Sequence, residues 1–259
     1  MSLKNRHALV CGASRGIGAA TAAALARDGV AVTLLARNAE ALQKVIQNLP
    51  VVKDRQHDFI VADVNDTEKL QLAVSEKTAA HNVQILINNS GGPAPGTAND
   101  ADPQAYAEAF RQHLIADQVL MQTVLPGMKT SGYGRIINII STSVKEPIPG
   151  LGVSNTIRAA VAAWAKTLSR ELGTHGITVN NVLPGYTATE RLDEIFRHQA
   201  KRAGRTLDEI VALRQAEVPL QRFAEPAEIA AAIAFLASPA ASYINGVNLP
   251  VDGGRSRGY

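Results

Sequence analysis

The chain has little of what several classes of protein depend on. Its 259 residues include one cysteine, Cys11, and one tryptophan, and aromatic residues make up only 4%. A single cysteine excludes an internal disulfide framework and a cysteine-ligated zinc site, and we expect no metal. The formal net charge is only +3 and no long block of Lys and Arg occurs. We therefore expect no nucleic-acid partner.

Long apolar runs are missing as well. The first ten residues, MSLKNRHALV, lead almost directly into a short apolar run and contain no signal-peptide-like region. No run reaches the roughly 20 residues that a membrane-spanning helix needs. Apolar residues at 46% and charged residues at 19% are ordinary for a soluble globular enzyme. We therefore expect a cytoplasmic protein with no membrane partner.

Short apolar runs alternate with alanine-rich helical stretches along almost the whole chain. Runs this apolar are buried on both faces, which indicates a parallel sheet covered by helices. We therefore predict an α/β fold of the Rossmann type, a doubly wound parallel sheet of about seven strands in a single domain over residues 1–259. The predicted strands are His7–Cys11, Ala31–Ala36, Asp58–Ala62, Gln84–Asn88, Arg135–Ile140, Thr178–Leu183 and Val247–Val251.

Two segments depart from this alternation. Asn88–Asp102 is a loop rich in Gly, Pro and Asn, and Glu190–Arg222 inserts two helices that form a candidate lid over a ligand. The lid carries a basic run, for which a solvated helix face and a clamp for an acidic substrate are the two interpretations. The run consists of Arg197, Lys201, Arg202 and Arg205. Helix-start patterns occur at Asp102-Pro103, at Thr206 with Glu209, and at Glu225-Pro226 with Glu228.

The first predicted strand ends in a glycine-rich turn, Gly12-Ala13-Ser14-Arg15-Gly16-Ile17-Gly18. Glycines let the backbone approach phosphates closely and the following helix N-terminus attracts them, so the turn predicts a nucleotide site. Arg37 directly follows the second predicted strand, at the position where a carboxylate would otherwise bind the ribose 2′-hydroxyl. Arg15 and Arg37 suit a 2′-phosphate, which favours NADP(H) over NAD(H); a plain surface arginine is the alternative for Arg37.

The segment Gly134–Arg158 has the layout of an active-site region but contains no Tyr, His or Cys. An apolar strand leads into Ser141 and a polar loop. The helix that follows carries Ser154 and Arg158 one turn apart on one face. Strand end, loop and helix start are where open α/β sheets place their chemistry.

An ordered set of motifs resembles those of the short-chain dehydrogenase/reductase family, and most closely its 3-oxoacyl-acyl-carrier-protein reductase branch. The set covers nearly the whole chain: Gly12-x-x-x-Gly16-x-Gly18, Asp63-Val64, Asn88-Asn89-Ser90-Gly91, Pro184-Gly185 and Asp252-Gly253-Gly254. Cys11 and Ser90 are mild departures, because the family usually has Thr and Ala there.

The resemblance implies a set of cofactor contacts. Asp63 and Val64 would meet the adenine, Asn89 to Gly91 the adenosine ribose, and Pro184, Gly185 and Thr189 the nicotinamide. Together with the glycine turn, the candidate cofactor-binding residues are Gly12, Ser14, Arg15, Gly16, Ile17, Gly18, Arg37, Asp63, Val64, Asn89, Ser90, Gly91, Arg158, Pro184, Gly185 and Thr189.

The catalytic positions depart furthest from the family, which uses Asn, Ser and a Tyr-x-x-x-Lys pair. Ser141 matches the family serine, whereas Ser154 stands at the tyrosine position and Arg158 at the lysine position. The asparagine position holds His113. An alcohol is a far weaker acid than a phenol, yet losing a general acid costs about 10²–10⁴-fold of a typical acceleration of about 10⁶ or more. The substitution weakens the enzyme hypothesis without removing it.

An unusual proton donor is therefore required. The candidates are Tyr186, Lys145, Glu146 and His113, with Tyr186 first because a phenol is the lost group. Each has a structural alternative: Tyr186 as a pocket wall, Lys145 and Glu146 as solvated loop charges, and His113 as a buried helix histidine. His113 would titrate near neutrality if unperturbed. The candidate catalytic set is Ser141, Ser154, Arg158 and Tyr186.

The sequence thus predicts an NADP(H)-dependent oxidoreductase that reduces a small-molecule carbonyl, possibly a 3-oxoacyl thioester, or oxidises the matching alcohol. The alternative is a non-catalytic NADP(H)-binding protein of the same fold, a sensor or assembly partner. The helix after Ser154 is rich in alanine, with Trp164 as its one large residue. A helix apolar on most faces is usually buried, and the resemblance implies a homotetramer, with a dimer as the alternative.

Overall fold

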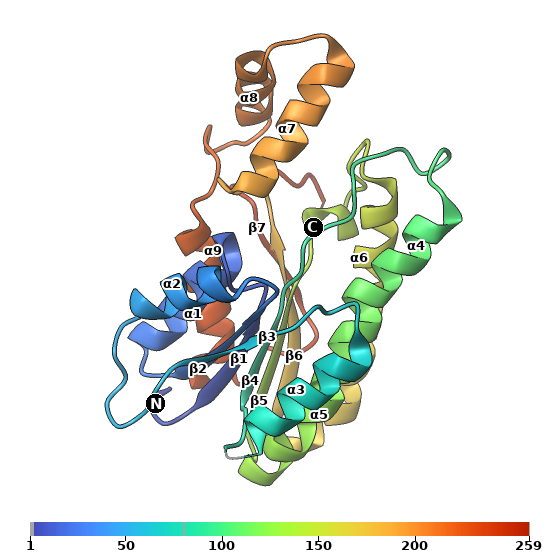
Figure 1. The fold of residues 1–259 in the computed structure, drawn as a ribbon. Coiled ribbons are helices and arrows are strands. Elements are labelled where there is room, and N and C mark those ends of the chain that lie inside the picture. The colour runs from blue at the N-terminus through green and yellow to red at the C-terminus, as the bar shows by residue number, and fades with distance from the viewer. Residues whose placement is uncertain (1–2, 80, 259) are drawn as a thin grey trace.

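The computed structural model describes residues 3–79 and 81–258 and contains a seven-stranded sheet whose neighbouring strands all pair in parallel (Figure 1). The strand order is β3-β2-β1-β4-β5-β6-β7, so the chain reverses its direction of winding between β1 and β4. The predicted doubly wound sheet is confirmed. The strands are β1 (His7–Cys11), β2 (Ala31–Ala36), β3 (Asp58–Val61), β4 (Ile85–Asn88), β5 (Gly134–Ile139), β6 (Ile177–Pro184) and β7 (Asn248–Val251).

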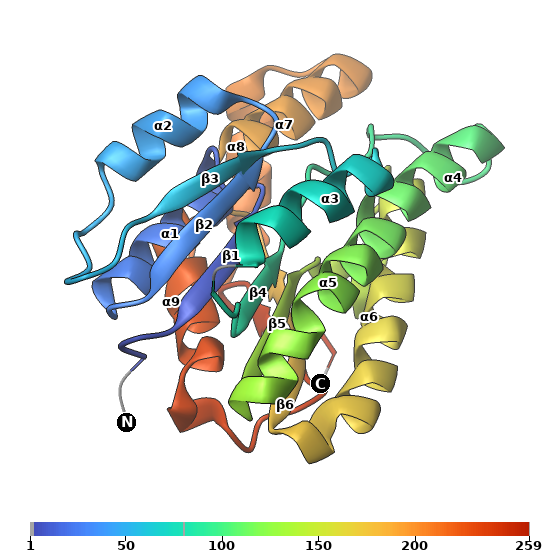
Figure 2. The same cartoon turned by 60° about the horizontal axis from the view of Figure 1, so that its bottom comes forward.

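Helices cover both faces of the sheet, with α1, α2 and α9 on one face and α3, α5 and α6 on the other (Figure 2). Apolar side chains fill the two layers, among them Leu25 and Ile233 on the first face and Leu120 and Leu168 on the second. The helices are α1 (Gly16–Arg27), α2 (Ala39–Gln47), α3 (Thr67–Thr78), α4 (Pro103–Phe110), α5 (Ala116–Ser131), α6 (Gly152–Leu172), α7 (Glu190–Ala203), α8 (Leu207–Ala216) and α9 (Pro226–Ala237).

The inserted helices α7 and α8 stand beyond the end of the sheet at which the strands finish (Figure 1). The start of α8 follows the predicted capping chemistry. The Thr206 side chain accepts a hydrogen bond from the Glu209 amide at 3.2 Å, and the Glu209 carboxylate accepts one from the Thr206 amide at 2.8 Å. The two helices predicted within Glu190–Arg222 are therefore confirmed.

A row of asparagine side chains crosses the sheet and was not predicted from the sequence. Asn88 donates to Asn138 at 2.8 Å, Asn138 to Asn181 at 2.8 Å, and Asn181 to Asn248 at 2.7 Å. Each pair occupies directly opposed positions of β4, β5, β6 and β7. Because the first three members are buried, each amide depends on the next for its hydrogen bond.

The loop after β4 is fixed against the start of α6. The Gly96 amide donates to the Gly150 carbonyl at 2.8 Å, and the Gly152 amide donates to the Gly96 carbonyl at 2.9 Å. This bridge brings the predicted cofactor loop against the segment that carries Ser154. Within residues 3–79 and 81–258, no helix is both long and apolar enough to cross a membrane.

Candidate active site

The glycine turn after β1 is shaped for close approach by a ligand. Gly12 and Gly16 have φ of +58° and +56°, a conformation that residues with a Cβ rarely adopt. A Cβ on Gly18 would lie 2.2 Å from the Gly12 carbonyl oxygen. The turn leads into α1, whose N-cap residue Arg15 makes no side-chain cap, so no side chain there occupies the first amides of the helix. This geometry fits a phosphate-bearing cofactor.

Two arginines reach the edge of this turn. Arg15 pairs with Glu190, the first residue of α7, and both side chains are largely exposed. Arg37 follows β2, is exposed, and has no ion-pair partner among the described residues. Asn38 beside it caps α2 by accepting from the Ala41 amide at 2.9 Å. The end of β2 therefore presents a cation where NAD-specific sites present a carboxylate.

The other predicted cofactor residues lie at the same edge of the sheet. Asn89 donates from Nδ2 to the carbonyls of Cys11 and Gly12 at 3.3 and 3.2 Å, so it ties the β4 loop to the glycine turn. Asp63 is exposed after β3 and accepts from the Asn65 amide at 2.9 Å. Val64 next to it packs on the core layer beneath. The strand ends thus surround the switch point between β1 and β4, where such sheets bind ligands.

The predicted catalytic serines are held differently. Ser141 follows β5 after one intervening residue, Ile140, and its Oγ accepts from the Ser143 amide at 3.0 Å, which fixes the hydroxyl. Ser154 lies in the first turn of α6, is half-buried, and has no side-chain hydrogen bond within the described chain. One hydroxyl is therefore oriented and the other is free to bond a ligand.

Arg158 is a buried cation at the centre of the site. Its side chain is 9% exposed, and Nη1 donates to the Ile139 carbonyl at the end of β5 at 3.0 Å. Burial lowers the pKa of Arg158 to about 10, against the raising effect of the Asp117 carboxylate on α5. Burial also raises the pKa of Asp117, while Arg158 opposes that shift. At neutral pH, Arg158 keeps its charge.

His113 lies in a π-helical turn, Arg111–Ile115, between α4 and α5. Its Nδ1 is 2.6 Å from Ser90 Oγ on the β4 loop. Burial, with a contribution from Arg158, lowers the pKa of His113 to about 2, so the ring does not titrate near neutrality as an unperturbed histidine would. The neutral ring joins helix and loop, as the buried-histidine alternative has it, and it lacks the second ring proton that an imidazolium gives up as an acid.

Tyr186 faces the lid. Its hydroxyl donates to Glu217 at 3.1 Å, and its ring packs edge-on against Phe196 and Phe223. Burial and the nearby Glu217 raise the pKa of Tyr186, with Arg255 opposing the shift. Each of these contacts favours the pocket-wall role, and its assignment as proton donor stays a prediction. Lys145 and Glu146 are exposed, as solvated charges would be.

The first turn of α7 closes over the site. Thr189 caps α7 by accepting from the Leu192 amide at 3.3 Å, and a Cβ on Gly16 would lie 3.4 Å from its methyl group. Arg191 donates to the Pro93 carbonyl at 2.7 Å, which ties the lid to the β4 loop. The basic run further along α7 is exposed, which favours the solvated-face interpretation.

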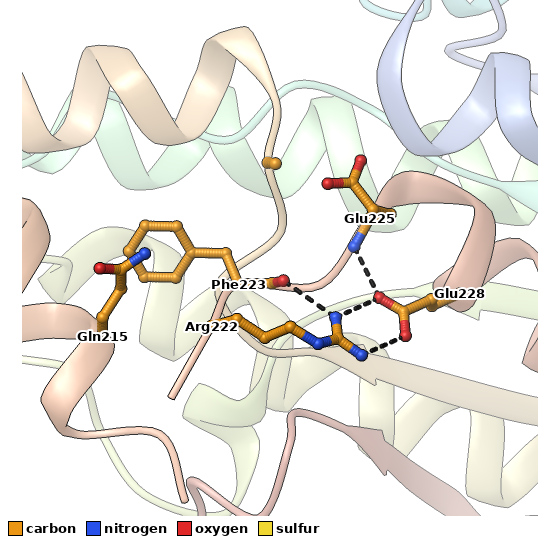
Figure 3. Close-up of a pocket in the computed structure, with 6 residues that line it drawn as sticks. Gln215, Arg222, Phe223, Glu225 and Glu228 are labelled. Atoms are coloured by element: carbon orange, nitrogen blue, oxygen red, sulfur yellow. Dashed lines mark hydrogen bonds and ion pairs between the residues drawn. The ribbon is translucent and has the colours of Figure 1, made fainter. Parts of the chain in front are cut away.

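Beside the lid, a cavity of about 540 Å³ opens between the end of α8 and the start of α9. Arg222 crosses it and donates to the Phe223 carbonyl at 3.1 Å and to both carboxylate oxygens of Glu228 at 2.6 Å (Figure 3). None of the predicted catalytic residues lines this cavity. The ion pair occupies it and anchors the base of the lid.

Asp117 and Arg191 were not predicted from the sequence, although the charges of both shift the pKa of Arg158. For Asp117 the sequence does offer one indication, because it lies one helical turn after His113 and therefore shares a helix face with it. Nothing in the local sequence distinguishes Arg191 from its basic neighbours. Within the described part of the chain, no cluster of three or more His, Cys, Asp or Glu side chains could hold a metal ion.

Comparison with known proteins gives consistent relatives along the whole chain. The family model described as enoyl-(acyl carrier protein) reductase matches residues 12–256. The chain is 32% identical over 256 residues to the 3-oxoacyl-acyl-carrier-protein reductase FabG of Vibrio cholerae, covering 98% of both. It is 29% identical over 254 residues to the NADPH-dependent reductase BacG of Bacillus subtilis, covering 97% and 98%.

Solved structures give a similar result. The fold is similar to that of L-sorbose reductase from Gluconobacter frateurii complexed with NADPH and L-sorbose, with a TM-score of 0.92. The two chains are 27% identical, and the match covers 100% of this chain and 99% of the other. Sequence relatives and structural neighbours therefore agree on one kind of protein.

Proposed function

The chain belongs to the short-chain dehydrogenase/reductase family, and from this premise we propose that it is an NADP(H)-dependent reductase of a small-molecule carbonyl. The observation that carries the proposal is that the glycine turn after β1 and the buried, charged Arg158, which is bonded to the end of β5, lie at the same edge of the parallel sheet. A cofactor cradle and a site for negative charge on a substrate therefore share one edge of the sheet.

Different groups of the chain would bind different parts of the cofactor. The glycine turn and the first amides of α1 would hold the pyrophosphate, and Arg15 and Arg37 the 2′-phosphate. Asp63, Val64 and Asn89 to Gly91 would line the adenosine, and Pro184, Gly185 and Thr189 the nicotinamide. The NADPH-dependent relatives support this preference over NAD(H).

When bound, NADPH supplies the hydride, and the chain must handle the charge that develops on the substrate oxygen. Ser141, held by the Ser143 amide, would donate a hydrogen bond to that oxygen. The Arg158 guanidinium would stabilise the same negative charge and orient the cofactor ribose. Ser154 would pass a proton from water to the oxygen, since its hydroxyl has no other side-chain partner. Water loses one proton, and the hydroxide leaves to solvent.

An acyl-thioester is the substrate class that we propose within this activity, because FabG of Vibrio cholerae is named for it. The cationic site favours a substrate whose oxygen becomes negative, which a 3-oxoacyl group does. The residues themselves do not select one carbonyl over another.

A second candidate is reduction of the double bond of an α,β-unsaturated carbonyl. The observation that favours it is the combination of a buried cation with no phenol at position 154. Hydride addition to the distal carbon gives an enolate, whose oxygen needs charge stabilisation from Arg158 more than an acid. The matching family model is described as an enoyl reductase.

The test begins with fluorescence titration of the purified protein with NADPH and NADH. Cofactor consumption is then followed with 3-oxoacyl thioesters, simple ketones and aldehydes, and 2-enoyl thioesters. We expect NADPH binding and slow turnover of one carbonyl class, lowered by Ser154→Ala and unchanged by Ser75→Ala on the exposed face of α3. Turnover of enoyl substrates alone would establish the second candidate.

A stronger variant separates a weak enzyme from a non-catalytic binding protein. Ser154→Tyr combined with Arg158→Lys restores the family's pair and is expected to raise turnover by about 10²-fold or more. Tight NADPH binding with no turnover on any class, unrestored by this double variant, would instead establish the sensor or assembly-partner alternative.

A further inference from the structure

A second large cavity lies at the opposite edge of the sheet from the glycine turn. It has a volume of about 860 Å³ and is lined by Arg6, which precedes β1, and by residues at the starts of β5 and β6. The glycine turn and Ser141 follow the ends of their strands, and these strands are parallel. The cavity is therefore separate from the candidate active site, and its size is that of a small-ligand pocket.

The lining of this cavity is cationic. Arg6 and Arg135 both contribute to it, and no aspartate or glutamate does. Neither arginine has a carboxylate within ion-pair distance among residues 3–79 and 81–258. Buried arginines are normally paired, so the buried Arg135 beside the half-buried Arg6, neither with a carboxylate, calls for a counter-charge.

The two arginines and a neighbouring threonine also carry hydrogen-bond donors that have no partner. Nε of Arg6, Nε of Arg135 and Oγ1 of Thr178 are buried and have no partner. Arg135 is only 3% exposed, and its Nη1 already donates to the carbonyls of Gly134 and Gly176 at 2.8 and 3.2 Å. All three residues line the cavity. Because these three atoms are buried in the wall, a ligand in the open cavity would instead meet the outer nitrogens of the two guanidinium groups.

Tyr133 holds the two cations in place. The Arg6 and Arg135 guanidinium carbons lie 3.2 and 3.9 Å from the centroid of its ring. The Tyr133 hydroxyl donates to the Ala237 carbonyl at 2.6 Å, which fixes the ring. Burial lowers the pKa of Arg135 and the charge of Arg6 adds to that effect, so a bound anion would relieve both. The cationic pair is therefore positioned before any ligand arrives.

We propose that this cavity binds a small organic anion whose phosphate or carboxylate oxygens contact the Arg6 and Arg135 guanidinium groups at the cavity wall. The apolar walls, Ile177 and Pro239 among them, would contact the body of the molecule. The inference is independent of the proposed reductase activity, since it uses none of the residues of that site.

Isothermal titration of the full chain in a chloride buffer tests the proposal, with inorganic phosphate, phenyl phosphate and benzoate as probes. We expect one saturable event for at least one probe, weakened roughly ten- to hundredfold by Arg6→Gln, as for loss of a charged hydrogen bond. Arg27→Gln, an exposed arginine at the end of α1, is the matched control and should change nothing. The probe that binds with the higher affinity shows whether the site prefers a phosphate or a carboxylate.

Binding at the glycine turn must be separated from binding at this cavity. The double variant Arg15→Gln with Arg37→Ala should keep the event that Arg6→Gln removes, and Arg6→Gln should keep the NADPH affinity of the wild type. Loss of the event in the double variant but not in Arg6→Gln would overturn the proposal. The proposal would also be overturned if no probe bound. A third contrary result would be that Arg6→Gln changes only the oligomeric mass measured by light scattering, because the cavity would then be an interface between copies of the chain.

Discussion

Arg158 shows how one side chain sets the character of a site. A buried lysine can lose its proton, whereas an arginine with a pKa near 10 stays charged throughout the physiological range. The site therefore has a fixed positive field, and Ser141 beside it has a fixed hydroxyl. Fixed charge favours stabilisation of an anionic oxygen, and proton supply becomes the weak step of the proposed reaction.

Arg37 is the residue on which cofactor choice depends. Arg37→Ala removes a charged hydrogen bond to the 2′-phosphate, which is worth about 1.5–3 kcal/mol, so NADPH should bind roughly ten- to hundredfold more weakly. NADH affinity should not change, because it lacks that phosphate. Fluorescence titration of both cofactors measures this, with Arg27→Ala as control. Equal NADPH affinity in variant and wild type would refute the 2′-phosphate argument.

His113 and His7 should make the fold sensitive to acid. Burial lowers their pKa values from 6.5 to about 2 and about 4 respectively, so the unfolded chain binds more protons than the folded one below pH 6.5. The free energy of unfolding should therefore fall as the pH drops from 6.5, by up to about 1.4 kcal/mol per pH unit for each histidine.

Denaturant unfolding at several pH values between 6.5 and 4 measures this slope. His113→Gln should flatten it by up to one histidine's share, while His175→Gln, at an exposed position, should leave it unchanged. A slope that is the same in His113→Gln and the wild type would mean that His113 is protonated in the folded chain.

At the scale of elements, the asparagine row should make β4 to β7 unfold together. Asn138→Val leaves the buried Nδ2 donor of Asn88 and the buried Oδ1 acceptor of Asn181 without their partner, which costs about 1–3 kcal/mol for each. A double-mutant cycle separates the contact from general loss of polarity. The pair Asn88 and Asn138, bonded directly, should show coupling of about 0.5 kcal/mol or more, whereas Asn88 with Asn248 should be additive. If the stability effects of both pairs were additive, the asparagine row would not couple the strands.

Strands and helix starts could be predicted because their signals are local. Apolar runs fixed all seven strands to within one residue at each end, and Thr206 with Glu209 marked the start of α8. The asparagine row could not be predicted, because its pairs depend on strand order and register. Asparagine also disfavours strands, so its presence in β5 and β6 carries no local signal of a partner.

The first turn of α7 links the lid to the glycine turn through the ion pair of Glu190 with Arg15. Both side chains are more than 60% exposed, so the pair is worth about 0–1 kcal/mol. If Arg15 must leave Glu190 to reach the 2′-phosphate, Glu190→Gln should tighten NADPH binding by up to about fivefold and leave NADH unchanged. Added salt should reduce the difference in NADPH affinity between the variant and the wild type. Weaker binding would mean that Glu190 holds Arg15 in its binding position.

Across the whole molecule, the candidate site draws on segments far apart in the chain. The glycine turn, the β4 loop and the end of β5 were predicted because each carries its own motif. Asp117 and Arg191 act through the fold: a buried position on α5 and a lid turn bring them within electrostatic reach of Arg158. Charges that matter only through tertiary proximity have no signature in a single sequence.

Oligomerisation is the last expectation that the structure makes testable. On the face formed by α4 to α6, Phe110 is 40% and Ile115 38% exposed. The α6 residues Ala159 and Ala163 are exposed one turn apart, which permits close approach of a second helix. If the homotetramer forms through this face, Ala163→Glu should halve the mass measured by light scattering, because it buries an unpaired charge. Ala203→Glu, on the exposed face of α7, should keep the full mass. A wild-type monomer, or equal mass in both variants, would exclude assembly through α6.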